Sequence, residues 1–239
     1  DDRPLGGEVA MKIHPVVQRF LINEVGRDFV VGDIHGCFER LRYELDAIGF
    51  DETRDRLFSV GDLVDRGPSS EEAIDWIAKP WFHAVRGNHE QMAIGVAEGR
   101  HDAGNYLVNG GGWFLQLPDE RQQVISQIFD TLPYLIEIET TFGRVGIVHA
   151  EIYGDSWDDF IADFKDADSN NKRNRFRETA LWARTRITQG ESNTIRGVDI
   201  LYVGHTPVKM PVHLANVHYI DTGAVFGGKL TVVEIGSDS

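Results

Sequence analysis

The chain of 239 residues contains one cysteine, Cys37, and lacks any long hydrophobic run. A single thiol excludes an intrachain disulfide, so we expect an intracellular setting, with Cys37 as a buried packing residue. No apolar stretch approaches the roughly 20 residues that a membrane-spanning helix needs, and no secretory signal pattern is visible. The sequence therefore predicts an intracellular protein with no membrane partner.

Basic residues are scarce relative to acidic ones. The chain has 24 Lys and Arg against 38 Asp and Glu, a formal net charge of −14. Because a phosphate backbone requires a basic surface, this balance argues against nucleic acid as a partner. It does not exclude small anionic substrates, since a site that holds metal cations can attract phosphate locally.

The sequence predicts one domain. Residues 1–10 are polar and precede Met11, and we interpret them as a cloning remnant or a flexible, disordered leader. Residues 11–239 contain no repeat, linker or low-complexity tract at which the chain would divide. Hydrophobic residues make up 41% of the chain, which is ample for the core of a single catalytic domain.

Strands and helices are expected to alternate in the first half of the chain. Strands are expected at 28–33, 57–62 and 81–86, and helices at 37–48, from residue 69 and from residue 91. Ser69-Ser70-Glu71-Glu72 has the capping hydroxyl and the acidic first turn of a helix start. Asn88 and His89 precede the third helix in this interpretation, on an extended segment where neighbouring side chains diverge.

The region 99–130 is expected to be mostly helical, with an interruption at 109–112. This Asn-Gly-Gly-Gly segment could be a hinge or a backbone approach to a ligand, but a turn between helices is the preferred interpretation. Residues 134–139 and 144–148 are predicted to form a hairpin, and further strands are expected at 200–203, 217–220 and 230–235. The charged stretch 155–177 is interpreted as an exposed, partly helical excursion with a solvated face.

Glycine-flanked polar clusters follow several of the expected strands. Around Asp62, the apolar run Leu57 to Val60 leads into the cluster, and Gly67-Pro68 then turns the chain away. An incidental ion pair in a solvated loop would explain this segment alone, but the pattern recurs. The candidate metal ligands at these strand ends are Asp33, His35, Asp62, Asn88, His149 and His205.

These six ligands indicate a binuclear metal site. Carboxylate, amide and imidazole groups suit manganese, iron or zinc, and the set excludes a thiolate structural site. Six ligands are too many for one catalytic ion that keeps an open position. They fit two ions about 3.5–4 Å apart that share one carboxylate.

The same segments resemble a known family. The motifs are Gly32-Asp33-Ile34-His35-Gly36, Gly61-Asp62-Leu63-Val64-Asp65-Arg66-Gly67 and Gly87-Asn88-His89-Glu90, with later blocks at His149-Ala150 and Gly204-His205-Thr206-Pro207. They resemble the phosphoprotein phosphatase branch of the metallophosphoesterases, in particular its bacteriophage lambda and bacterial members. The resemblance extends to Asn109-Gly110-Gly111-Gly112-Trp113-Phe114 and to Ile220-Asp221-Thr222-Gly223-Ala224-Val225-Phe226, and it covers nearly all of 29–235.

The resemblance implies a fold and a set of residue roles. The expected fold is α/β, a sandwich of two mixed β-sheets flanked by helices in α-β-β-α layers. One metal would be held by Asp33, His35 and Asp62, and the second by Asp62, Asn88, His149 and His205. Arg66 and Arg86 match phosphate-binding arginines, Arg184 is a weaker match, His89 matches the general acid, and Asp65 matches the carboxylate that orients it.

The activity implied is hydrolysis of phosphoserine and phosphothreonine in proteins by a water that bridges two divalent metal ions, with inorganic phosphate as product. Manganese is expected first, with iron, zinc, cobalt or nickel as alternatives, and the setting would be the bacterial cytoplasm, for a bacterial or phage-encoded protein. Phosphotyrosine also remains open as a substrate.

Two rival functions are weighed. A symmetrical diadenosine tetraphosphatase shares the metal signature, but that branch lacks an acid at the position of Asp65. A non-catalytic scaffold would be expected to have lost metal ligands or His89, which are all present here.

Overall fold

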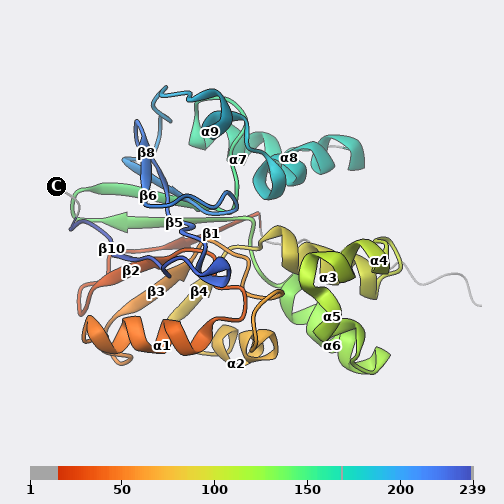
Figure 1. The fold of residues 1–239 in the computed structure, drawn as a ribbon. Coiled ribbons are helices and arrows are strands. Elements are labelled where there is room, and N and C mark those ends of the chain that lie inside the picture. Colours follow the sequence, from red (N-terminus) through yellow and green to blue (C-terminus); the bar gives the residue numbers. More distant parts are fainter. Residues whose placement is uncertain (1–15, 168, 238–239) are drawn as a thin grey trace, which may run out of the picture.

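Two β-sheets packed between layers of helices form the framework (Figure 1). The structure, a computed structural model, describes residues 16–167 and 169–237, so the leader expected at 1–10 lies outside the described residues. The four-stranded sheet has the order β10 (Val232–Glu234), β2 (Asp28–Val31), β3 (Arg56–Ser59), β4 (Phe82–Ala84). The six-stranded sheet has the order β1 (Val17–Phe20), β5 (Leu135–Thr140), β6 (Gly143–Val148), β7 (Ile200–Val203), β9 (Val217–Tyr219), β8 (Val212–Leu214).

Both sheets are mixed, as expected. β2, β3 and β4 run parallel and β10 pairs antiparallel with β2. In the larger sheet, β5–β6 and β8–β9 are antiparallel and the other pairs are parallel. Parallel neighbours place the carboxyl ends of their strands at the same edge, where α/β sheets expose their sites.

Helices cover the outer faces of the two sheets (Figure 1). On the side of the four-stranded sheet these are α1 (Phe38–Ala47), a 3₁₀ turn at Ser70–Glu72 and α2 (Ala73–Ile77). A helical group beside them contains α3 (Asn88–Ala97), α4 (Ala103–Tyr106), the turn η2 (Leu107–Gly111), α5 (Gly112–Leu115) and α6 (Asp119–Asp130). The six-stranded sheet is covered by α7 (Trp157–Lys165), α8 (Asn170–Trp182) and α9 (Thr185–Gln189), and a 3₁₀ turn, η3 (Ala224–Phe226), precedes β10.

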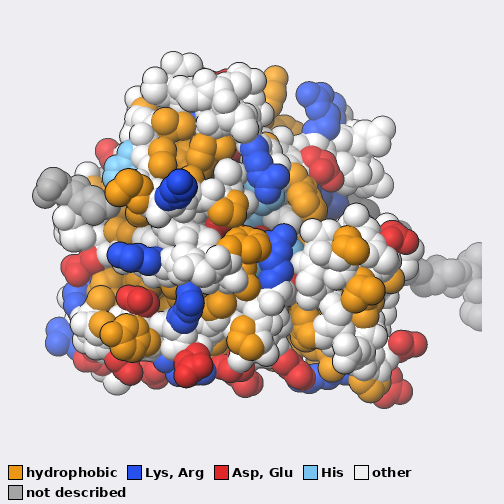
Figure 2. Space-filling view, in the orientation of Figure 1, with side chains coloured by type: hydrophobic (Ala, Val, Ile, Leu, Met, Phe, Trp, Pro, Cys, Tyr) orange, Lys and Arg blue, Asp and Glu red, His pale blue; other side chains and the backbone are white. Residues whose placement is uncertain are grey.

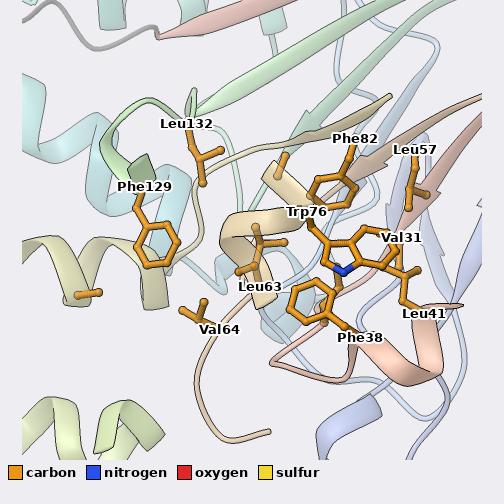
Figure 3. Close-up of a cluster of buried hydrophobic side chains, with 14 of the residues drawn as sticks. Val31, Phe38, Leu41, Leu57, Leu63, Val64, Trp76, Phe82, Phe129 and Leu132 are labelled. Carbon is orange, nitrogen blue, oxygen red and sulfur yellow. The ribbon is translucent and has the colours of Figure 1, made fainter. Parts of the chain in front are cut away.

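Three apolar clusters hold these layers together. Between the sheets, Val30 and Phe58 meet Ile136 and Ile147, all fully buried, because alternate residues of each strand face inward. Under the four-stranded sheet, Phe38 stacks on Trp76 at a centroid distance of 5.4 Å (Figure 3). The third cluster lies between the six-stranded sheet and α7 and α8. Among the described residues, no helix combines the length and the apolar character needed to cross a bilayer.

The structure corrects several local expectations. Helix α3 begins at Asn88, three residues before the expected start, because Gly87 is extended and the Glu90 side chain accepts the N–H of Gly87 at 2.8 Å. Asn88 and His89 therefore diverge as neighbours on a helix and not on an extended segment. Ser69 makes no side-chain cap; instead, Ser70 Oγ accepts the backbone N–H of Asp65.

The excursion expected at 155–177 is only partly exposed. Trp157, Phe160, Ile161 and Phe164 of α7 are buried against the six-stranded sheet, and only the following helix has a largely solvated face. The helical spacing of these apolar residues was masked by the surrounding charges. The short elements β1, β8 and α9 were not predicted at all.

Candidate metal centre and active site

The six candidate ligands converge from the strand ends of both sheets. Asp33 and His35 follow β2, Asp62 follows β3, and Asn88 begins the helix after β4. His149 and His205 follow β6 and β7 of the larger sheet. All six side chains are buried, with 5% or less of their surface exposed. The site therefore lies at the common carboxyl edge of the two sheets, as the sequence predicts.

Left-handed backbone conformations concentrate in this site. His35, Asp62, Asp65, Arg66 and His205 have φ values between 44° and 70°. Among the described residues the only other non-glycine with positive φ is an alanine in the β8–β9 turn. Such conformations are unfavourable for residues with a Cβ and persist where the surrounding structure enforces them. The local strain is thus located where the candidate chemistry is.

One group of ligands contains acceptors that face one another. His149 Nδ1 lies 2.8 Å from the carbonyl oxygen of Val60, so this nitrogen carries the proton and Nε2 has a lone pair. His205 Nε2 lies 3.2 Å from the carbonyl of Trp182, which leaves Nδ1 with the lone pair. Both lone pairs lie 2.8 Å from Asn88 Oδ1, itself an acceptor.

A cation bound among these atoms would remove the repulsion. Two ring nitrogens and an amide oxygen, with Asp62 Oδ1 at 3.4 Å from His149 Nε2, share no proton among them. Acceptors at these distances repel unless positive charge lies between them. The donor set, nitrogen with amide and carboxylate oxygen, fits a divalent transition-metal ion.

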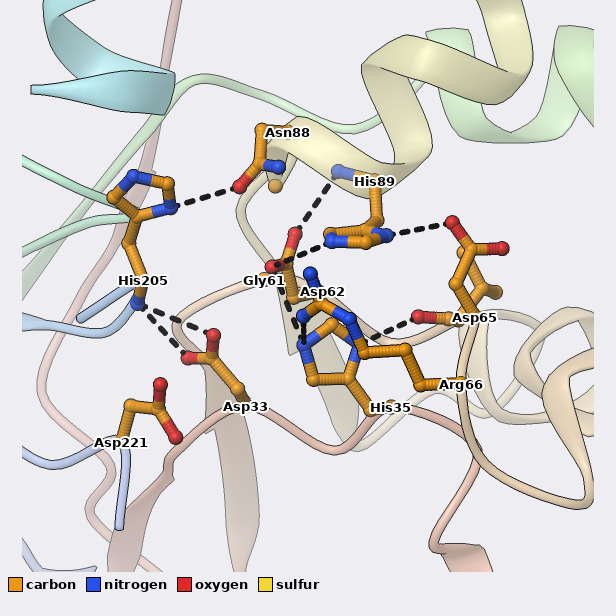
Figure 4. A network of polar contacts seen from close by, with 12 residues as sticks. Asp33, His35, Gly61, Asp62, Asp65, Arg66, Asn88, His89, His205 and Asp221 are labelled. Atoms are coloured by element: carbon orange, nitrogen blue, oxygen red, sulfur yellow. Dashed lines mark hydrogen bonds and ion pairs between the residues drawn. The ribbon is translucent and has the colours of Figure 1, made fainter. Parts of the chain in front are cut away.

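A second group surrounds the other carboxylate oxygen of Asp62 (Figure 4). His35 donates from Nδ1 to the carbonyl of Val64 at 2.8 Å, and its Nε2 lies 3.5 Å from Asp62 Oδ2. His89 Nε2 lies 3.9 Å from the same oxygen. Asp62 thus contacts both groups, the position expected for a shared ligand.

Asp33 is differently placed from the other candidates. Its two oxygens accept the backbone N–H of His205, each at 3.2 Å (Figure 4). Burial, together with the nearby carboxylates of Asp221 and Asp62, raises the pKa of Asp33 well above its ordinary value. A cation bound beside Asp33 would offset the repulsion between these carboxylates. The role of Asp33 as a metal ligand stays a prediction, and its surroundings favour it.

Burial also sets the protonation of the imidazoles. It lowers the pKa of His35 to about 4 and that of His205 to about 3, against the partial compensation of Asp62. The pKa of His149 is lowered for the same reason. These rings are therefore neutral at physiological pH, which is the form that binds metals.

His89 and Asp65 form a separate buried pair. His89 Nδ1 lies 2.6 Å from Asp65 Oδ2, and both side chains are almost completely enclosed (Figure 4). Burial lowers the pKa of His89, but the carboxylates of Asp62 and Asp65 outweigh it and raise the pKa above its ordinary value. His89 therefore holds its second proton to a higher pH than an ordinary histidine does, at the edge of the candidate metal centre.

The three arginines occupy different environments. Arg66 is exposed, donates from Nη1 to His35 Nε2 at 2.9 Å and lies with its guanidinium 5.4 Å from the Phe226 ring centroid. Arg184 is also exposed and donates to the carbonyl of His205 at 3.4 Å. Figure 2 shows His side chains between two groups of Lys and Arg side chains on this face.

Arg86, the third arginine expected to bind phosphate, is enclosed and already bonded to other residues of the protein. Only 1% of its surface is exposed, and its guanidinium bonds to Gln91, Tyr134, Asp130 and the carbonyl of Leu132 at 2.7–3.3 Å. These contacts tie the start of α3 to the end of α6 and the following turn. Direct phosphate contact by Arg86 stays a prediction, and the engaged guanidinium argues against it.

Glu90 is a functional candidate that the sequence reasoning missed. Its Oε1 accepts the backbone N–H groups of Leu63 and Val64, and its Oε2 accepts those of Asp62 and Gly87, at 2.8–3.3 Å. Burial and the neighbouring Asp62 carboxylate raise its pKa to about 7. The signal was its position directly after two candidate site residues in a helix's first turn.

Asp221 was also missed. It is 3% exposed, lies near Asp33 (Figure 4), and accepts the N–H of Gly223 at 2.9 Å. Burial, with a contribution from Asp62, raises its pKa to about 6. An apolar strand followed by an aspartate and a glycine is the same pattern that marked Asp62, so the signal was present in Ile220-Asp221-Thr222-Gly223.

A two-sheet sandwich with clustered carboxylate, amide and imidazole groups at its strand ends has the architecture expected of a metal-dependent hydrolase. The comparison with protein families agrees with this class. The model of the calcineurin-like phosphoesterases matches residues 29–213, and the chain belongs to this family.

Individual relatives refine the comparison. The chain is 37% identical over 230 residues to serine/threonine-protein phosphatase 1 of Salmonella typhimurium, covering 94% of this chain and 99% of that protein. It is 30% identical over 237 residues to the asymmetrical bis(5'-nucleosyl)-tetraphosphatase PrpE of Bacillus cereus, covering 84% and 87%. Among solved structures, a cold-active protein tyrosine phosphatase superposes with a TM-score of 0.59 at 18% identity, covering 92% of this chain and 75% of that one, and this likeness shows the fold alone.

Proposed function

We propose that this protein is a manganese-dependent serine/threonine protein phosphatase of the bacterial cytoplasm. Its substrates are phosphorylated proteins or peptides and its product is inorganic phosphate. The identity with a named serine/threonine-protein phosphatase along almost the whole chain supports this proposal. The site-forming residues are Asp33, His35, Asp62, Asn88, His149 and His205 as ligands, with Arg66 and Arg184 at the phosphate.

The chemistry follows from charge. Bound divalent cations would neutralise the phosphate dianion and activate the attacking water. Arg66 and Arg184 are exposed at the rim of the ligand groups, where their guanidiniums can stabilise charge on the phosphate oxygens. No serine or cysteine with the context of a nucleophile lies among these residues, so water attacks phosphorus directly.

His89 is the general acid in this proposal. Because its Nδ1 is committed to Asp65, Nε2 is the nitrogen that donates a proton. As the P–O ester bond breaks, its electron pair goes to the leaving oxygen, which takes the proton from Nε2. Asp65 stabilises the imidazolium before transfer.

The Asp65–His89 pair is the observation that favours a phosphate ester over a phosphoanhydride as substrate. A serine or threonine alkoxide is a poor leaving group and needs a proton, whereas a phosphoanhydride releases a phosphate that is already a stable anion. A fully enclosed Asp65–His89 pair at 2.6 Å is therefore built for an ester and would add little for a dinucleoside polyphosphate. The resemblance to PrpE keeps the latter as the second candidate.

The deciding experiment uses protein stripped of metal and refilled with single metal ions. Turnover is measured on p-nitrophenyl phosphate, a panel of phosphoserine, phosphothreonine and phosphotyrosine peptides, and diadenosine tetraphosphate. We expect kcat/KM to be highest on phosphoserine or phosphothreonine peptides with Mn²⁺. Preferential cleavage of diadenosine tetraphosphate would replace the proposal with the second candidate, and no turnover with any metal would indicate a binding scaffold.

A further inference from the structure

The second oxygen of Asp65 has two further donors. While Oδ2 faces His89, Oδ1 accepts the hydroxyl of Tyr106 at 2.8 Å and the indole N–H of Trp113 at 2.7 Å. Asp65 and Tyr106 are completely buried, and Trp113 is half-buried. The backbone N–H of Asp65 is held as well, by Ser70 Oγ at 2.8 Å. Every polar group of this side chain is thus directed by a neighbour.

The two donors come from the segment around the glycine triplet, which the proposed function does not otherwise use. Tyr106 ends α4 and Trp113 lies in α5. A Cβ on Gly111 would lie 2.4 Å from the Tyr106 ring, and Gly110, at φ 99°, directs its carbonyl at the N–H of Arg66. Small residues here let both donors reach one carboxylate oxygen.

We propose that Tyr106 and Trp113 are positioning residues for acid catalysis: together they fix the Asp65 carboxylate so that its other oxygen orients His89. The inference rests on the proposed function, since it presumes that His89 is the acid. In the part of the chain that the structure describes, neither residue hydrogen-bonds to His89; both donate to Asp65. Their effect on the reaction is therefore transmitted through Asp65.

The physical basis is the rotation of a carboxylate. With Oδ1 bound to two donors, turning the group would break a buried and a partly buried hydrogen bond at once, and leave the carboxylate oxygen and the Tyr106 hydroxyl unpaired at a cost. Both donors are neutral, so they hold Asp65 without cancelling the charge that attracts the His89 proton. Burial and Asp65 raise the pKa of the Tyr106 hydroxyl well above its ordinary value, so it remains a donor.

The test removes the two donors and keeps an aromatic ring at each position. Tyr106→Phe, Trp113→Phe and the double variant, all loaded with Mn²⁺, are assayed on a phosphoserine peptide and on p-nitrophenyl phosphate. General acids contribute about 10²–10⁴-fold, so we expect the double variant to lose about 10-fold or more in kcat on phosphoserine with KM unchanged. On p-nitrophenyl phosphate, whose leaving group needs little protonation, the loss should be several-fold smaller.

Phe114→Leu is the matched control. Phe114 is fully buried and packs edge-on against the rings of Tyr106 and Trp113, at centroid distances of 5.9 and 5.6 Å, but donates nothing to Asp65. It should lower the melting temperature without changing the ratio of kcat on the two esters. If the double variant does not fold, Trp113→Phe alone decides, because it deletes one N–H and keeps an aromatic ring.

The outcomes separate the two proposals. Equal losses on both esters in the double variant, or a ratio shift as large in Phe114→Leu, would overturn the positioning role. His89→Asn is measured alongside. If it also loses equally on both esters, the acid assignment itself fails; if it loses selectively while the double variant does not, only the role of Tyr106 and Trp113 fails.

Discussion

At the scale of single residues, backbone carbonyls decide which ring nitrogens are left to bind a cation. The carbonyls of Val60 and Val64 each accept the Nδ1 proton of one histidine, His149 and His35, so the lone pair of each ring is on Nε2. This fixes the tautomer and the ring orientation before any metal binds. Histidines in motifs of this kind are therefore best judged by the partner of the other ring nitrogen.

Arg66 and Arg86 should respond differently to removal. Arg66→Ala should raise KM for phosphate esters and weaken inhibition by inorganic phosphate, because its exposed guanidinium lies at His35. Arg86→Ala should instead lower the free energy of unfolding by about 2 kcal/mol or more, because it removes an enclosed guanidinium and its partly buried pair with Asp130. Steady-state kinetics with phosphate as inhibitor and urea unfolding check both.

The contrast between these two variants is informative in itself. If Arg86→Ala folds with unchanged stability and loses phosphate inhibition as Arg66→Ala does, the guanidinium contacts phosphate despite its enclosure. If neither variant changes phosphate inhibition, Arg66 is wrongly assigned too.

At the scale of elements, strand β4 contains a histidine whose environment is apolar. His83 packs against the rings of Phe20 and Phe58, at centroid distances of 4.3 and 5.2 Å, and burial, with Arg56 nearby, lowers its pKa to about 4. The unfolded chain binds this proton near pH 6.5, so between about pH 6.5 and 4 the unfolded state holds more protons. Its contribution to stability is therefore complete above pH 6.5 and is lost as the pH falls toward 4.

His83→Phe should remove this acid sensitivity. Urea midpoints measured for metal-free protein from pH 7 to pH 4 should fall less steeply in the variant than in the wild type. A parallel fall in both proteins would show that His83 is not the group that takes up the proton.

Helix α7 should be essential for stability although it lies in the charged stretch. Trp157 is completely buried on the six-stranded sheet and donates from its indole to Glu137 at 2.8 Å. Trp157→Ala should cost about 3–5 kcal/mol of unfolding free energy. Arg175→Ala, on the exposed face of α8, should stay within about 0.5 kcal/mol by the same urea titration. Similar small effects in both variants would support the original interpretation of residues 155–177 as an exposed segment.

The elements that the sequence predicts well are those whose periodicity extends over several residues. Phe38, Leu41 and Leu45 recur at helical spacing and form α1 as expected. Three-residue strands such as β8 have too few residues for alternation to be visible. The start of α3 depends on the Glu90 carboxylate reaching Gly87, a side-chain contact that no local pattern encodes.

The candidate site divides in the same way. The convergence of the candidate ligands could be predicted because each lies shortly after a buried strand, and strand ends meet at one edge. Tyr106 could not, because it reaches Asp65 from 41 residues away through the packing of two short helices. Arg86 is the reverse case, because its position in a motif suggested a contact with phosphate. In the structure its guanidinium is held by Asp130 and Tyr134.

At the scale of the whole molecule, the ligand groups connect the two sheets. Asp62 follows a strand of the four-stranded sheet, while His149 and His205 follow strands of the six-stranded one. A cation bound by all three would therefore join the two layers of the sandwich at one edge. Binding to the folded state alone also stabilises it by mass action, by about 2.7 kcal/mol at 100 times the Kd.

Removing metal should therefore lower the melting temperature, and Mn²⁺ should restore it in a concentration-dependent way. For a chain of this size the shift should be about 5–10 °C. Asp62→Asn should abolish most of it, because this carboxylate contacts both ligand groups, whereas Asp163→Asn makes the same change on the exposed surface of α7 and should respond like the wild type. Scanning calorimetry of chelator-treated protein titrated with Mn²⁺, with metal analysis of each sample, provides the measurement. Active protein holding less than one ion per chain, or an Asp62→Asn variant that Mn²⁺ stabilises as strongly as the wild type, would show that these residues do not form the metal centre.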